Sequence, residues 1–235
     1  ISFWEREKTM HEGHRKRMRE KFLKEGLEGL QDHEKMEMIL YTCISRKNTN
    51  EIGHALINTF GSFSAVFDAP LEELMKVKGI GESSAIFIKM IPQICRCYLD
   101  DKTDVTKSAL TDEKIGQIFL SKFIGLMNEN VMLLLMDKKQ KFLYCGKVSE
   151  GSVNASEIYI RKIVELAMRY NASKAVIAHN HPSGIALPSR EDLLATQATY
   201  KSLKLVGVKL IDHIIVADND YVSLAQSNLG SDFFG

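Results

Sequence analysis

The chain is poor in cysteine and proline and has no long apolar run. Its 235 residues include only 4 cysteines, 4 prolines and 1 tryptophan. The cysteines form no Cys-x-x-Cys pair, and Cys95-x-Cys97 is a poor spacing on a helix for zinc or for a disulfide. Reduced thiols in the cytoplasm are the simpler interpretation. No apolar stretch approaches the roughly 20 residues that span a bilayer, so we expect no membrane segment.

An excess of charge of one sign is also missing. The formal net charge is +1 at pH 7, which gives no global attraction to nucleic acid or to an anionic membrane. The first residues, Ile1 to Trp4, contain no Met and no signal-peptide pattern, so a trimmed N-terminus is one interpretation. A chain of this length can bury a substantial core and can form two compact domains.

Residues 1–104 are predicted to form an all-α domain. A basic amphipathic helix is expected over residues 13–25, with solvated surface as its favoured role. Residues 36–44 should supply core. Asn50 and Gly61 are expected to cap the two ends of the next helix. We place the domain boundary at residue 104, at the end of a polar stretch.

Two glycines between predicted helices suggest a phosphate contact. Lys78-Gly79-Ile80-Gly81 separates a helix over residues 71–77 from another that begins at Glu82, which resembles a helix-hairpin-helix motif. Glycines let backbone N–H groups at the second helix start approach a phosphate closely, and Lys76 and Lys78 would add salt-dependent affinity. Such hairpins also serve purely as packing units, so contact with DNA and a structural role both stay open.

Residues 105–235 are predicted to form an α/β domain. Apolar runs predict strands over residues 131–136, 141–148, 175–178, 208–216 and 221–224. Apolar stripes at helical spacing predict helices over residues 156–171 and 190–204. This alternation of strands and helices indicates α/β layers around a mixed sheet.

The most informative segment carries two histidines and an aspartate. On a strand, alternate side chains project to one face, so His179 and His181 should both point into one pocket. Asp192 comes three residues after Ser189, where a helix is expected to begin. Two imidazoles and a carboxylate suit zinc, which in catalytic sites typically takes three protein ligands and a water. Ser-x-x-Asp is also an ordinary helix N-cap pattern, and the two roles can coexist.

These residues resemble the JAMM motif of MPN-type metallopeptidases. The motif His-x-His-Pro, then Ser, then x-x-Asp matches at His179, His181, Pro182, Ser189 and Asp192. The extended form His-Asn-His-Pro-Ser-Gly is similar to that of RadC proteins. Further RadC-like segments lie at residues 13–17, 46–50, 78–81 and 212–216, so the resemblance covers nearly the whole chain. It implies a cytidine-deaminase-like MPN/JAMM α/β (α+β) domain that follows an all-α helix-hairpin-helix-like domain.

The resemblance also implies roles for individual residues. His179, His181 and Asp192 would hold one zinc ion, Zn2+, with water in the fourth position. The general base would be a Glu at the start of a strand well upstream of the histidines, a placement that Glu129 matches, with Glu150 and Glu157 as alternatives. Ser189 would hydrogen-bond the developing oxyanion, which can be worth roughly 3 kcal/mol.

One further histidine has two interpretations. His213 follows Asp212 at the expected start of a strand whose neighbour the sequence does not reveal. An ordinary role in the strand or turn is favoured, and orientation of a metal ligand is the alternative.

Three functions stay open. The leading one is a zinc-dependent metallopeptidase or isopeptidase that acts on a peptide or isopeptide substrate. The second is a DNA-associated factor with an accessory metal site, because the RadC name carries a DNA-repair label and the first domain has the hairpin. The third is a hydrolase of a small amide, with the first domain as a platform. The sequence names no substrate.

Overall fold

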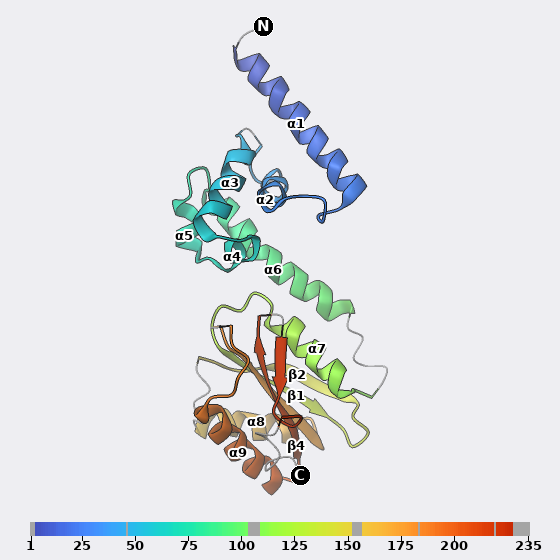
Figure 1. Cartoon of the computed structure of the whole chain (residues 1–235). Coiled ribbons are helices and arrows are strands. Elements are labelled where there is room, and N and C mark those ends of the chain that lie inside the picture. Colours follow the sequence, from blue (N-terminus) through green and yellow to red (C-terminus); the bar gives the residue numbers. More distant parts are fainter. Residues whose placement is uncertain are drawn as a thin grey trace. The chain divides into compact units, whose positions relative to one another are not determined.

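In the computed structural model the chain folds into two compact units, Ile1–Ile94 and Cys95–Gly235 (Figure 1). The structure describes residues 3–45, 47–102, 109–151, 157–182, 184–218 and 220–227, with the backbone alone for residues 3–12, 157 and 158. Among these residues, no helix combines the length and the apolar character that a membrane crossing requires.

The first unit is built from helices. They are α1 (Phe3–Glu25), α2 (Asp32–Leu40), α3 (Thr49–Phe60), α4 (Phe63–Asp68), α5 (Leu71–Lys76) and α6 (Glu82–Lys102), which continues into the second unit. The predicted core segment is confirmed, since Met36, Leu40 and Ile44 are all buried. Helices α2 and α3 approach closely at Gly53, where a Cβ atom would lie 2.5 Å from the backbone oxygen of His33.

The prediction that Asn50 caps α3 is wrong, whereas the predicted end at Gly61 is confirmed. Asn48 is the N-cap, and its side-chain oxygen accepts from the backbone N–H of Asn50 at 3.1 Å. The side chain of Asn50 instead donates to Glu37 at 2.9 Å. Glu37 is only 1% exposed, and a buried carboxylate requires donors. Gly61 ends the helix in the left-handed region, at φ +90°.

The same carboxylate joins two of the RadC-like segments. His14 on α1 lies 2.9 Å from Glu37, and Tyr41 donates its hydroxyl to Glu37 at 2.8 Å. Arg15 donates to the backbone oxygens of Ile44 and Lys47. The segments at residues 13–17 and 46–50 therefore meet around one buried charge, which gives them a structural role in this unit.

The second unit contains one mixed sheet. Its helices are α7 (Asp112–Phe123), α8 (Glu157–Arg169) and α9 (Arg190–Leu205), and its strands are β1 (Asn130–Met136), β2 (Phe142–Glu150), β3 (Lys174–Asn180), β4 (Lys209–Ala217) and β5 (Asp220–Ser223). The described strands run in the order β2-β1-β3-β4-β5. Strands β3 and β4 are parallel, and the other neighbours are antiparallel. The predicted mixed α/β fold is confirmed.

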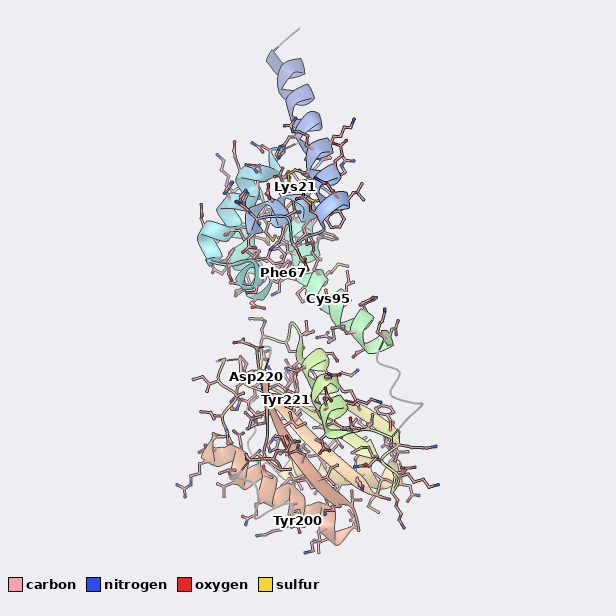
Figure 2. All side chains as sticks on the ribbon, turned by 45° about the vertical axis from the view of Figure 1, so that its right-hand side comes forward. Lys21, Phe67, Cys95, Tyr200, Asp220 and Tyr221 are labelled. Carbon is pink, nitrogen blue, oxygen red and sulfur yellow. The ribbon has the colours of Figure 1, made fainter. Side chains whose placement is uncertain are left out.

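Helices cover both faces of the sheet (Figure 1). On one face, residues such as Leu133 and Ile177 form a core with α8 and α9. On the other face, Leu134 and Val176 pack with α7, a helix that the strand pattern did not predict. Tyr221 on β5, labelled in Figure 2, comes so close to α7 that a Cβ atom at Gly116 would overlap its ring.

Candidate metal centre

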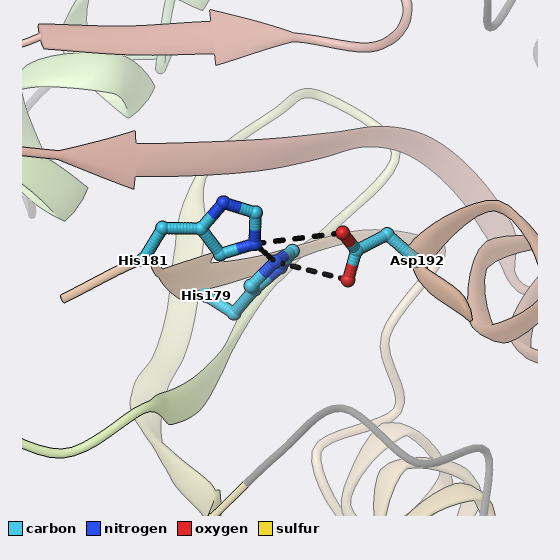
Figure 3. Close-up of side chains that lie close together, drawn as sticks. All are labelled: His179, His181 and Asp192. Atoms are coloured by element: carbon cyan, nitrogen blue, oxygen red, sulfur yellow. Dashed lines mark hydrogen bonds and ion pairs between the residues drawn. The ribbon is translucent and has the colours of Figure 1, made fainter. Parts of the chain in front are cut away.

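The end of β3 and the start of α9 bring three side chains together, as predicted (Figure 3). His179 lies near the end of β3 and His181 directly follows the strand, while Asp192 lies in the first turn of α9. The Nε2 atoms of His179 and His181 are 2.8 Å apart. They lie 3.1 Å and 3.5 Å from the two carboxylate oxygens of Asp192. One ligand atom from each residue lies within 4.8 Å of the others.

The helix cap fixes the Asp192 carboxylate. The backbone N–H and the hydroxyl of Ser189 both donate to Asp192 Oδ2 at 2.7 Å, and the N–H of Asp192 donates to Ser189 Oγ at 3.1 Å. Burial opposes ionisation, but the neighbouring His179 ring and the two hydrogen bonds from Ser189 hold the pKa of Asp192 well below its ordinary value. Asp192 is therefore an anion, and the capping interpretation of Ser-x-x-Asp is confirmed.

His181 is oriented by the loop that follows it. Its Nδ1 atom lies 2.9 Å from the backbone oxygen of Ile185. A carbonyl oxygen can only accept, so Nδ1 carries the proton and the neutral ring has its lone pair on Nε2. That lone pair faces His179 and Asp192.

These donors fit a cation. The Nε2 lone pair of His181, the Nε2 atom of His179 and an ionised carboxylate converge, and electron-rich atoms this close repel unless a positive charge lies between them. Imidazole nitrogen with one carboxylate suits zinc and similar transition metals, whereas magnesium and calcium prefer all-oxygen sites. The residues present therefore fit the group that the motif implies.

The predicted base comes directly before the strand that pairs with the histidine strand. Val131 and His179 are partners across β1 and β3, and the N–H of Asn130 donates to the side chain of Asn180 at 2.8 Å. Glu129 immediately precedes this pair, on the loop that enters β1. The alternation of side chains along a strand favours the same face for Glu129, Val131 and His179. Its role as a base stays a prediction.

Of the two alternative bases, only Glu150 has a side chain that the structure describes. The carboxylate of Glu150 lies 2.7 Å from Lys147 and accepts from Asn128 at 3.2 Å. The bond to Lys147, followed by that from Asn128, lowers the pKa of Glu150, which makes it a weaker base. The side chain of Glu157 lies outside the described residues.

The sequence analysis missed one buried residue behind the site, Thr196, and did not favour a role in the site for another, His213. His213, for which a strand role was favoured, is fully buried and lies 2.8 Å from Nδ1 of His179. Thr196, one turn after Asp192 on α9, contacts the far side of the His213 ring. The spacing of four residues between Asp192 and Thr196 was the available signal, because such residues share a helix face.

Comparison with protein families identifies the chain. A family model described as RadC-like JAB domain matches residues 109–229, and a UPF0758 N-terminal model matches residues 8–86. The chain belongs to the RadC family. The RadC-like match includes the whole sheet and all three converging side chains, so the predicted JAB/MPN fold is confirmed.

RadC-family relatives resemble the chain along nearly its whole length. A UPF0758 protein of Bacillus pumilus is 32% identical over 216 residues, which cover 92% of this chain and 96% of the relative. A UPF0758 protein of Fusobacterium nucleatum is 32% identical over 226 residues, with 93% and 97% covered. One from Coprothermobacter proteolyticus is 33% identical over 218 residues, with 91% and 92% covered. These names state no activity.

Proposed function

We propose that this RadC-family protein is a zinc-dependent hydrolase of peptide or isopeptide bonds. The observation that carries the proposal is the convergence of His179, His181 and Asp192 within 4.8 Å at one strand end and one helix start. An anionic carboxylate that faces two imidazole nitrogens in a buried place requires a compensating cation. Three ligands of this kind leave a position open for water, as in catalytic rather than structural zinc sites.

The protein's residues would divide the chemistry as follows. Zinc, when bound, lowers the pKa of water toward about 7 and polarises a carbonyl group. Glu129 takes the proton from the attacking water and delivers it to the departing nitrogen. In the structure Ser189 donates its hydroxyl proton to the Asp192 carboxylate; to stabilise the oxyanion, that single proton would turn from Asp192 toward the substrate.

The surroundings of the site favour a peptide over a nucleic acid. The loop between His181 and Ser189 exposes two aliphatic side chains, Ile185 at 60% and Leu187 at 64%. This loop touches the site directly, because the Ile185 oxygen accepts from His181. Apolar side chains can pack against a peptide, whereas affinity for a phosphate backbone comes chiefly from Lys and Arg. A small amide would satisfy the same chemistry and is the alternative substrate.

Metal content and its removal test this function. Protein purified without added metal is expected to contain about one equivalent of zinc per chain by elemental analysis. Incubation with a mixture of peptides and branched isopeptides should yield new N-termini by mass spectrometry. A chelator should abolish the cleavage, and zinc should restore it. Protein that holds no zinc, or cleavage that survives complete metal removal, would overturn the proposal.

We propose DNA binding by the first unit as a second function. Gly79 has φ +101° and packs against Ile52, whereas a Cβ built at Gly81 would meet no other segment within 4 Å, so a phosphate can approach the backbone at Gly81. Lys78 is exposed, whereas Lys76 is paired with Glu73 at 2.5 Å.

Fluorescence anisotropy should show that the protein binds duplex DNA with an affinity that falls steeply from about 50 to 200 mM salt. Lys78→Glu should weaken it, and Lys201→Glu in the second unit should not. No binding at low salt would exclude this function.

The cytoplasm is the compartment we propose. All four cysteines are free, and Cys95 and Cys97 are exposed. Exposed thiols persist best in a reducing environment.

A further inference from the structure

Two buried polar side chains form a hydrogen-bonded chain between two of the three converging residues. Nδ1 of His179 lies 2.8 Å from Nε2 of His213, and Nδ1 of His213 lies 2.6 Å from the Thr196 hydroxyl. That hydroxyl donates to the backbone oxygen of Asp192 at 2.6 Å. His213 and Thr196 are both 0% exposed. The chain starts on β3, crosses β4 and ends on α9.

The direction of every proton in this chain follows from its last member. The Asp192 carbonyl can only accept, so the single hydroxyl proton of Thr196 is directed to it. Thr196 must then accept from Nδ1–H of His213. His213 is 0% exposed, a position that disfavours a charged ring, so with its proton on Nδ1 the neutral ring presents Nε2 as an acceptor. His179 therefore donates from Nδ1, and its own Nε2 carries the lone pair that faces His181 and Asp192.

A β-bulge aims His213 at this position. Along the parallel pair β3 and β4, Ala175 faces Leu210 but Val176 faces Asp212, so β4 contains one extra residue. The extra residue shifts His213 opposite Ile177, on the face that carries His179. In an unbroken register His213 would point to the α7 face.

The bulge is held by the side chain before His213. Asp212 Oδ1 accepts from the N–H groups of His213 and Ala225 at 2.7 and 2.9 Å, and Oδ2 accepts from the Ser223 hydroxyl at 2.6 Å. The carboxylate thus ties β4 to the chain after β5. Asp212 therefore fixes the backbone of β4 at the bulge, and His213 contacts His179 in the site.

We propose that His213 and Thr196 are positioning residues that lock His179 in the tautomer able to bind a metal through Nε2. This inference rests on the proposed function, because it assumes that His179 binds a metal. It adds that the His179 ring already has the required tautomer before the metal binds. A ring fixed in this way loses little freedom on binding, and the removal of such outer partners typically lowers metal affinity about 10–100-fold.

Thr196→Val tests the chain with an almost isosteric change. The variant should bind zinc about 10–100-fold more weakly than wild type in competition with a chromophoric chelator. Thr196→Ser keeps the hydroxyl and should restore the affinity. Thr199→Val is the matched control, because Thr199 is equally buried one turn further along α9, and it should bind zinc as wild type does. Equal zinc affinity of Thr196→Val and wild type would overturn the proposal.

A second measurement needs neither a metal nor a variant. Imidazole ¹⁵N NMR of the metal-free wild type should show His179 and His213 both protonated at Nδ1. Protonation of His179 at Nε2 would overturn the inference even if Thr196→Val fails to fold. The two proposals can fail separately: wild type that takes up no zinc but shows these tautomers refutes the metal function alone. Wild type that binds zinc with His179 protonated at Nε2 when metal-free refutes the positioning role alone.

Discussion

His179→Ala is expected to remove the bound zinc and all metal-dependent hydrolysis. The Nε2 atom of His179 is the most central of the three donors, 2.8 Å from His181 and 3.1 Å from Asp192. Two remaining ligands do not make a catalytic zinc site, which takes three. The loss of affinity should exceed the roughly 10–100-fold that follows from loss of an outer partner. Elemental analysis after purification without added metal measures it.

The control for this variant is another histidine. His54 on α3 is exposed and stacks on His33 in the first unit, so His54→Ala should keep one equivalent of zinc. Asp192→Asn should behave like His179→Ala, because a neutral amide removes the negative charge of the site while its volume stays the same. Full zinc content in His179→Ala with an intact fold by circular dichroism would refute the ligand set.

The candidate ligands could be predicted because each depends on local geometry. Alternation along β3 places His179 and His181 on one face whatever the neighbouring strands do. The cap of α9 places Asp192 relative to Ser189 through bonds within four residues. The strands themselves and the α/β class followed from apolar runs that are long enough to be distinctive, whereas the order of the strands in the sheet could not be predicted.

What could not be predicted depends on contacts between distant segments. A bulge in β4 decides which face His213 occupies, and no residue type marks its place. Asn50 is a residue type that often caps helices, but its side chain donates to Glu37, which lies thirteen residues earlier in the chain. Helix α7 has apolar positions that face the sheet, yet its core partners, such as Ile214, come from strands near the end of the chain.

Glu129→Gln is expected to retain one equivalent of zinc and to lose turnover. The substitution keeps the size and the hydrogen-bonding reach of the side chain but removes its ability to accept a proton at neutral pH. General acid–base catalysis contributes about 10²–10⁴-fold, so hydrolysis of a peptide cleaved by wild type should fall by about that factor. Zinc content, which depends on other residues, should not change.

Glu150→Gln is the matched control for the base. Glu150 ends the edge strand β2, where its carboxylate contacts Lys147 and Asn128, so the loss of its charge should leave turnover close to that of wild type. In a plot of turnover against pH, the rise that reports deprotonation of the base should persist in Glu150→Gln and disappear in Glu129→Gln. If Glu129→Gln hydrolyses the peptide at the wild-type rate, another group takes the proton and Glu129 is not the base.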